Sequence, residues 1–121
     1  MDWEGLVTGG GLAPADLLSP VGTGPLWGIE TEDLNATLLA WPAGGATPEH
    51  ANSHRDVLLV VLEGSATVTV DGEEDVVHAG HAVTIRKGSV RRIVAGAGGV
   101  RYLTVHVRRS PLQIAPAPPA R

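Results

Sequence analysis

The sequence predicts an all-β protein folded as a jelly-roll barrel. Aliphatic stretches rich in β-branched residues follow one another along the chain, and no stretch has the apolar spacing of a long helix. The chain contains 16 Gly and 9 Pro, which separate these stretches at short intervals. About eight or nine short strands at this spacing are typical of a jelly-roll barrel. A length of 121 residues is enough for one such domain.

The first strands are expected before the histidine-rich part of the chain. Residues 26–31 and 34–41 are rich in strand-forming residues, and Asp33 supplies a turn between them. Residues 47–52 predict a third strand that would carry histidines.

The most hydrophobic run lies in the middle of the chain. Residues 57–62 are six consecutive aliphatic residues, which predict a strand buried on both faces. Residues 65–70 alternate between apolar side chains and threonine, which predicts a strand with one buried face. Asp71-Gly72 then predicts a two-residue hairpin.

The second half of the chain predicts further strands of the same kind. A returning strand is expected over residues 73–78 and a short one over 82–85. Two more are expected over residues 90–95 and 100–108, with a glycine-rich turn at 96–99 between them.

The composition also predicts the limits of the domain. Glycine and proline recur in residues 1–24, which predicts a loosely ordered arm, and residues 25–114 should form the barrel. Residues 115–121 contain mainly proline and alanine and should form an extended tail.

The composition argues against several classes of function. Nine basic and thirteen acidic residues give a net charge of −4, which argues against a nucleic-acid partner because such binding needs a strongly basic face. The absence of cysteine excludes disulfides and thiolate metal sites. The start has no basic segment followed by a long apolar run, and no run is long enough to cross a membrane. We therefore expect a cytoplasmic protein with no membrane partner.

Two stretches together resemble the motifs of the cupin superfamily. Residues 50–64 hold a histidine-rich segment, an aliphatic run and Leu-Glu-Gly, as in the first cupin motif. Residues 79–92 resemble the second motif, in which a Gly-Asp pair opens a strand that ends in a Pro-x-Gly turn and a histidine. The resemblance spans about residues 26–113 and implies the cupin barrel. The family includes dioxygenases, isomerases, decarboxylases, epimerases, storage proteins and ligand-sensing domains, so it implies no single reaction.

The resemblance implies that the metal site of the family is degenerate in this chain. Cupins hold Fe(II), Mn(II), Zn or Ni with two or three histidines and one glutamate. The matching positions, aligned on Gly64, are His50, Asn52, Val57 and Arg91. A guanidinium within about 4 Å of a divalent ion would repel it by roughly 8 kcal/mol at an effective dielectric constant of 20. Arg91 would then supply the positive charge at the barrel mouth, paired with Asp56.

The alternative hypothesis keeps a divalent transition metal but displaces it. His54 lies four residues after His50, and His106 lies on the last predicted strand, on the same face as Tyr102. A displaced site would use His50, His54 and His106. His106 would equally suit a core position in which it is hydrogen-bonded to Thr104 or to the backbone.

We therefore expect a small stand-alone cupin that binds a small anionic molecule in its barrel. The expected ligand-binding residues are His50, Asn52, Asp56, Arg91, Tyr102 and His106. The alternative is a metal-dependent enzyme of the dioxygenase or isomerase type that uses the displaced site, so enzymatic activity stays open. A homodimer is expected, because the apolar residues 111–114 and the amino-terminal arm could contact a partner subunit.

Overall fold

The computed structural model describes residues 12–47, 49–51 and 54–108. In these residues it shows seven strands and no helix, which confirms the all-β prediction. The strands are β1 (Gly24–Glu30), β2 (Leu34–Trp41), β3 (His50–Ala51), β4 (Val57–Val70), β5 (Glu73–His78), β6 (Ala82–Ile85) and β7 (Val90–Val107). Accordingly, no helix that would span a membrane occurs in the described residues.

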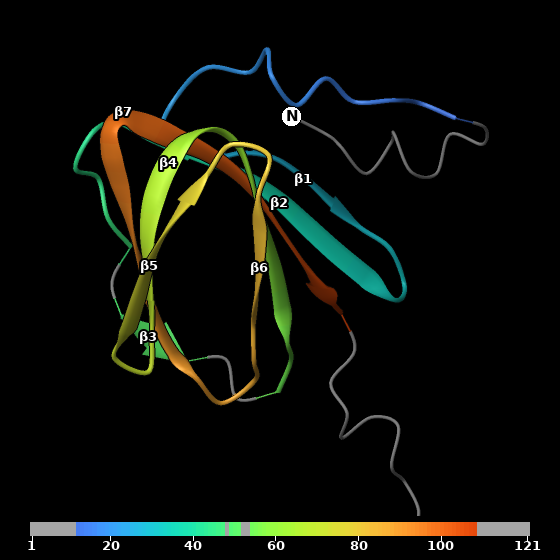
Figure 1. Cartoon of the computed structure of the whole chain (residues 1–121). Helices are drawn as coiled ribbons and strands as arrows, with labels where there is room; N and C mark the ends of the chain where they lie inside the picture. The colour runs from blue at the N-terminus through green and yellow to red at the C-terminus, as the bar shows by residue number, and fades with distance from the viewer. Residues whose placement is uncertain (1–11, 48, 52–53, 109–121) are drawn as a thin grey trace, which may run out of the picture.

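Two long strands, β4 and β7, organise the fold. Every pairing is antiparallel, and the order is β1-β2-β7-β4-β5, with β3 added to β7 and β6 added to β4. The first half of β4 pairs with the second half of β7, and the second half of β4 pairs with the first half of β7. Both strands bend over together and so contribute to two facing layers (Figure 1). This arrangement is the predicted jelly roll.

The bend requires glycine, because the two long strands approach closely there. A Cβ atom on Gly64, where φ is +75°, would lie 2.1 Å from the carbonyl oxygen of Gly99. A Cβ atom on Gly96 would lie 2.4 Å from Oγ of Ser65. The ladder between β4 and β7 shifts register on both sides of Gly64, which is how a long strand turns a corner without breaking.

Two of the predicted strand boundaries are wrong. Residues 57–62 and 65–70 belong to one strand, β4, and residues 90–95 and 100–107 belong to one strand, β7. The turn predicted at residues 96–99 is therefore absent. At these places glycine marks a bend within one strand, where residues 96–99 of β7 have no partner in β4, and a bend has the same local sequence signal as a turn.

The prediction that residues 57–62 are buried on both faces is also wrong. Leu59 is 0% exposed, whereas its neighbour Leu58 is 42% exposed. Burial therefore alternates along β4, because one face points between the layers and the other points outward. An aliphatic run on an outward face is indistinguishable in sequence from one that is covered.

The core fills the space between the two layers. Its buried residues come mostly from β4 and β7, and Tyr102 is the largest of them. The members are Val57, Leu59, Val61, Ala66, Val68, Val77, Ile85, Ile93, Ala95, Val100 and Tyr102. The side chains of Leu39 and Trp41 on β2 pack against this cluster from its edge.

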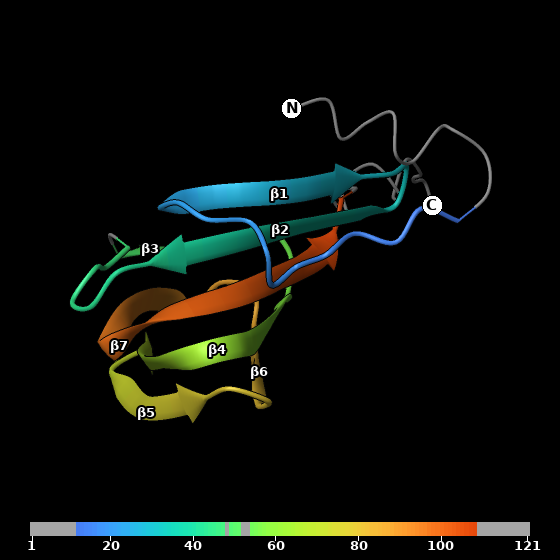
Figure 2. The ribbon, with the colours of Figure 1, turned by 90° about the horizontal axis from the view of Figure 1, so that it is seen from above.

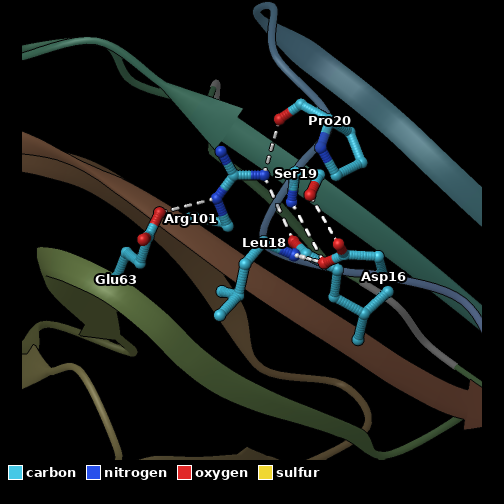
Figure 3. A network of polar contacts seen from close by, with 7 residues as sticks. Asp16, Leu18, Ser19, Pro20, Glu63 and Arg101 are labelled. Carbon is cyan, nitrogen blue, oxygen red and sulfur yellow. Dashed lines mark hydrogen bonds and ion pairs between the residues drawn. The ribbon is translucent and has the colours of Figure 1, made fainter.

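The described part of the amino-terminal arm crosses β2 and β7 before it enters β1 (Figure 2). Arg101 on β7 holds it there: Nη1 donates hydrogen bonds to the carbonyl oxygens of Leu17, at 3.2 Å, and Pro20, at 2.8 Å. Nε of the same side chain forms an ion pair with Glu63 at 2.9 Å (Figure 3). One guanidinium therefore joins the arm to both long strands. The predicted tail, residues 115–121, lies outside the described residues, as do residues 111–114.

Candidate functional site

A cavity of about 240 Å³ lies between the two layers, beside β2 and the start of β7. Its lining comes from β2, from both halves of β7 and from the segment before β3. The lining residues are Thr37, Leu39, Thr47, Arg91, Ile93, Tyr102 and Thr104. Within the part of the chain that the structure describes, Arg91 is the one charged side chain in this lining.

The guanidinium of Arg91 is half-buried at the start of β7. Burial lowers the pKa of Arg91 from its usual range, and the neighbouring Tyr102 acts in the opposite sense. Among the described residues, no side chain or carbonyl group accepts a hydrogen bond from this guanidinium, and none forms an ion pair with it. A cation thus faces the cavity with its hydrogen-bond donors available.

The hydroxyl group of Tyr102 is held by Trp41. Nε1 of Trp41 donates a hydrogen bond of 2.9 Å to Oη of Tyr102, and Tyr102 is 1% exposed. Burial raises the pKa of Tyr102, while the Trp41 hydrogen bond and the charge of Arg91 oppose that rise. The phenol is therefore neutral at physiological pH and keeps its proton as a donor.

The remaining lining combines two aliphatic side chains with three threonines. Leu39 on β2 is the direct cross-strand partner of Tyr102, and Ile93 belongs to the buried core. Oγ1 of Thr47 accepts a hydrogen bond of 3.1 Å from the backbone N–H of Ile93, which ties the segment before β3 to β7. The cavity thus has a cationic, donor-rich part and an apolar wall.

The structure brings two of the aligned motif positions together. His50 on β3 and Arg91 on β7 are Cα partners in the sheet. The side chain of His50 and all of Asn52 lie outside the described residues, so their contacts with a ligand stay predictions. Val57, at the position of the family's glutamate, is 2% exposed in the hydrophobic core.

Asp56 and His54 lie away from the cavity lining. Both are exposed in the segment before β4. Oδ1 of Asp56 accepts a hydrogen bond of 2.9 Å from the backbone N–H of Lys87. The predicted pairing of Asp56 with Arg91 is not among the ion pairs of the described residues, because the Asp56 carboxylate is turned toward the loop after β6 instead.

His106 shares a strand face with Tyr102 and Thr104, as the sequence indicated. Its Nδ1 lies 3.1 Å from the carbonyl oxygen of Val107, and Asn35 is its cross-strand partner. It is not part of the cavity lining. The contact is with the backbone but is exposed, and His106 is only partly buried, so it does not take the core position that the sequence suggested.

The described residues do not fit the metal site of the family. One aligned position holds a valine that belongs to the core and another holds an arginine, and neither donates an electron pair to a metal. No group of three or more His, Cys, Asp or Glu side chains among the described residues could hold a metal ion. The displaced site of His50, His54 and His106 depends on an imidazole outside those residues and stays a prediction.

Sequence reasoning missed most of the cavity wall. Thr37, Leu39 and Trp41 occupy alternate positions on β2 and so share a face, which could have been predicted from the sequence. The sequence does not predict which of the two faces of β2 points inward, because this depends on the register between β2 and β7.

A larger cavity, of about 400 Å³, lies between β5 and β6 at the other edge of the two layers. Its floor is formed by valines from β4, β5 and β6, and the acidic residues Glu73, Glu74 and Asp75 line it on β5. These carboxylates would repel an anion. The two cavities therefore differ in charge, and the smaller one is the candidate site because Arg91 lies there beside β3.

Solved structures of other proteins share this fold. A cupin protein from Bacteroides fragilis superposes with a TM-score of 0.66 at 18% identity, covering 91% of this chain and 92% of its own. KdgF from a Halomonas species gives a TM-score of 0.64 at 19% identity, covering 74% of this chain and 79% of its own. An RmlC-like cupin from Shewanella frigidimarina gives 0.63 at 23% identity, covering 74% and 80%. At these identities the likeness shows the fold alone.

The sequence comparisons agree with the structure. A search of curated proteins gives no match. The family model described as "Cupin domain" matches residues 37–106, which run from β2 almost to the end of β7 and include every residue of the cavity lining. This protein therefore belongs to the cupin domain family.

Proposed function

We propose that this cupin binds a small anionic molecule in the cavity beside Arg91, at the place where metal-dependent relatives would hold their ion. The observation that supports this most directly is the half-buried guanidinium of Arg91, which lines the cavity without a hydrogen-bond or ion-pair partner among the described residues.

Partial burial of the Arg91 guanidinium carries a cost in free energy. A cation removed from water is destabilising unless a counter-charge or hydrogen-bond acceptors compensate it. The lowered pKa of Arg91 reflects that cost. An anion in the cavity would compensate it, because a guanidinium binds a planar anion through two parallel hydrogen bonds.

Calorimetric titration with a panel of small anions tests this proposal. Binding to the wild-type protein should be lost in Arg91→Gln, which keeps a polar side chain but removes the charge. Arg92→Gln is the matched control, because Arg92 is the exposed neighbour on the opposite face of β7. Equal loss in both variants would contradict the proposal, since it would show a general charge effect.

A second experiment tests the alternative hypothesis of a metal-dependent enzyme. Elemental analysis of untagged protein should show less than stoichiometric transition metal. Near-stoichiometric metal that disappears in His50→Ala would overturn the proposal and support a dioxygenase or isomerase type of activity at His50, His54 and His106.

We also propose that the protein is a homodimer. Within the described chain, β1 pairs with β2 alone, so the other edge of β1 is available to a second copy. A monomer by light scattering at micromolar concentration would contradict this. The cytoplasmic location, and the absence of nucleic-acid and membrane partners, stay predictions.

A further inference from the structure

We infer that the anion is a small monocarboxylate with an apolar body, and that Tyr102 determines this specificity by donating a hydrogen bond to the carboxylate beside Arg91. This inference rests on the proposed function, since it names the class of anion that the same cavity would take.

The hydroxyl group of Tyr102 can donate a hydrogen bond to a ligand. Its phenol oxygen already accepts the N–H of Trp41, at 2.9 Å, so the oxygen is satisfied as an acceptor from that side. The O–H proton still needs an acceptor, and neighbouring Arg91 has only donors to offer. Among the described residues, nothing accepts the proton. A ligand acceptor between Tyr102 and Arg91 would satisfy both groups.

The charge of the cavity lining favours an anion with a single negative charge. Among the described residues, the lining holds one cationic side chain and no carboxylate. A single negative charge balances it, whereas a doubly charged phosphate ester would leave one charge uncompensated in a poorly solvated site. A carboxylate also has enough acceptor positions for the two donors of a guanidinium fork and for one phenol.

The size and lining of the cavity favour a small molecule with an apolar part. A cavity of about 240 Å³ lies below the range of roughly 300–1,000 Å³ that is typical of pockets for drug-sized ligands, so it suits a small molecule. The side chains of Leu39 and Ile93 contribute an apolar surface, which favours a ligand with a hydrocarbon part. Threonine hydroxyls also lie in the lining, so the calorimetric comparison of ligands decides how polar that part can be.

The experiment titrates the wild-type protein calorimetrically with acetate, butyrate, benzoate, butyramide and inorganic phosphate. We expect affinity to rise from acetate to butyrate and benzoate, because the larger apolar body buries more apolar surface. Butyramide, which has the same body without the charge, should bind at least about tenfold more weakly than butyrate, because hydrogen bonds to charged groups are the stronger ones.

Two variants assign the roles. Tyr102→Phe should weaken butyrate binding about tenfold or more, as expected for a lost hydrogen bond to a charged group, and should affect butyramide less. Arg92→Gln should leave both affinities unchanged. Thermal unfolding of each variant checks that it is folded. An unchanged ratio of butyrate to butyramide affinity in a folded Tyr102→Phe variant would overturn the role of Tyr102. If that variant does not fold, Trp41→Phe, which removes the hydrogen bond that orients the phenol, should lower the same ratio, and an unchanged ratio would count against the inference.

The outcomes separate this inference from the proposed function. Binding of phosphate in preference to every carboxylate, lost in Arg91→Gln, would overturn the monocarboxylate and retain an anion site. Equal affinity for butyrate and butyramide would also overturn the inference. Binding of no anion at all would overturn the proposed function as well.

Discussion

His50 and Arg91 are Cα partners across the pairing of β3 with β7. These positions lie 41 residues apart, one in each of the two stretches that resemble cupin motifs, so the fold brings the two stretches together. The second position carries a guanidinium in this chain. This guanidinium lines the cavity, and it is the basis of the proposed anion site.

The environment of Tyr102 can be measured directly, because it is the only tyrosine in the chain. Burial raises the pKa of its phenol above the usual value of about 10. An ultraviolet titration of the phenolate should therefore show a midpoint above that of free tyrosine. Trp41→Phe should move the midpoint further up, because the Trp41 hydrogen bond lowers this pKa. A midpoint at or below the free value would contradict the burial of this group.

The same pKa shift predicts how stability depends on pH. The folded state holds the Tyr102 proton more tightly than the unfolded state does. The contribution is therefore fully present below the unfolded pKa of about 10 and is lost as pH rises through the raised folded pKa. The free energy of unfolding, measured with urea, should fall in this alkaline range, and the fall should be smaller in Tyr102→Phe.

The bend of the two long strands predicts an effect of Gly64→Ala. The added Cβ would meet the carbonyl oxygen of Gly99 at 2.1 Å, so the backbones of β4 and β7 would have to separate. We expect a loss on the order of 3 kcal/mol or more in the free energy of unfolding.

Gly72→Ala is the matched control for the bend. Gly72 has a similar positive φ, of +85°, but nothing lies within 4 Å of its added Cβ. Only the backbone strain of about 1–2 kcal/mol should remain. Equal losses in the two variants would show that the close approach at Gly64 does not matter.

The alternation of burial in β4 predicts different effects for two adjacent leucines. Leu59→Ala removes a fully buried side chain from the core and should cost about 2–5 kcal/mol of unfolding free energy. Leu58→Ala changes a side chain that is 42% exposed and should cost less than about 1 kcal/mol. If urea unfolding showed a larger loss for Leu58→Ala than for Leu59→Ala, the assignment of the buried face of β4 would be wrong.

Arg101 predicts how the amino-terminal arm is held. Arg101→Gln removes the hydrogen bonds to the carbonyl oxygens of Leu17 and Pro20. Amide hydrogen exchange in residues 17–19 should then become faster, because the arm loses its anchor on β7. Arg108→Gln is the control: it breaks the exposed ion pair with Glu30 and should leave exchange in the arm unchanged.

The sequence alone determined the local features of this protein. The apolar alternation over residues 65–70, the Asp71-Gly72 hairpin and the short strands β5 and β6 were all predictable, because each depends on neighbours in the chain. The two motifs also indicated the family and its barrel. Arg91 was identified as the residue that replaces a metal ligand, because its position in the second motif could be read directly.

Only the tertiary structure decided the features that join distant parts of the chain. The Trp41–Tyr102 hydrogen bond spans 61 residues, and the contact between Arg101 and Pro20 spans 81. The continuity of β4 and β7 through their glycines, the inward face of β2 and the cavity wall depend on the same long-range register. The physical reason is that a strand's local sequence sets which residues share a face, whereas pairing with remote strands sets which face is buried.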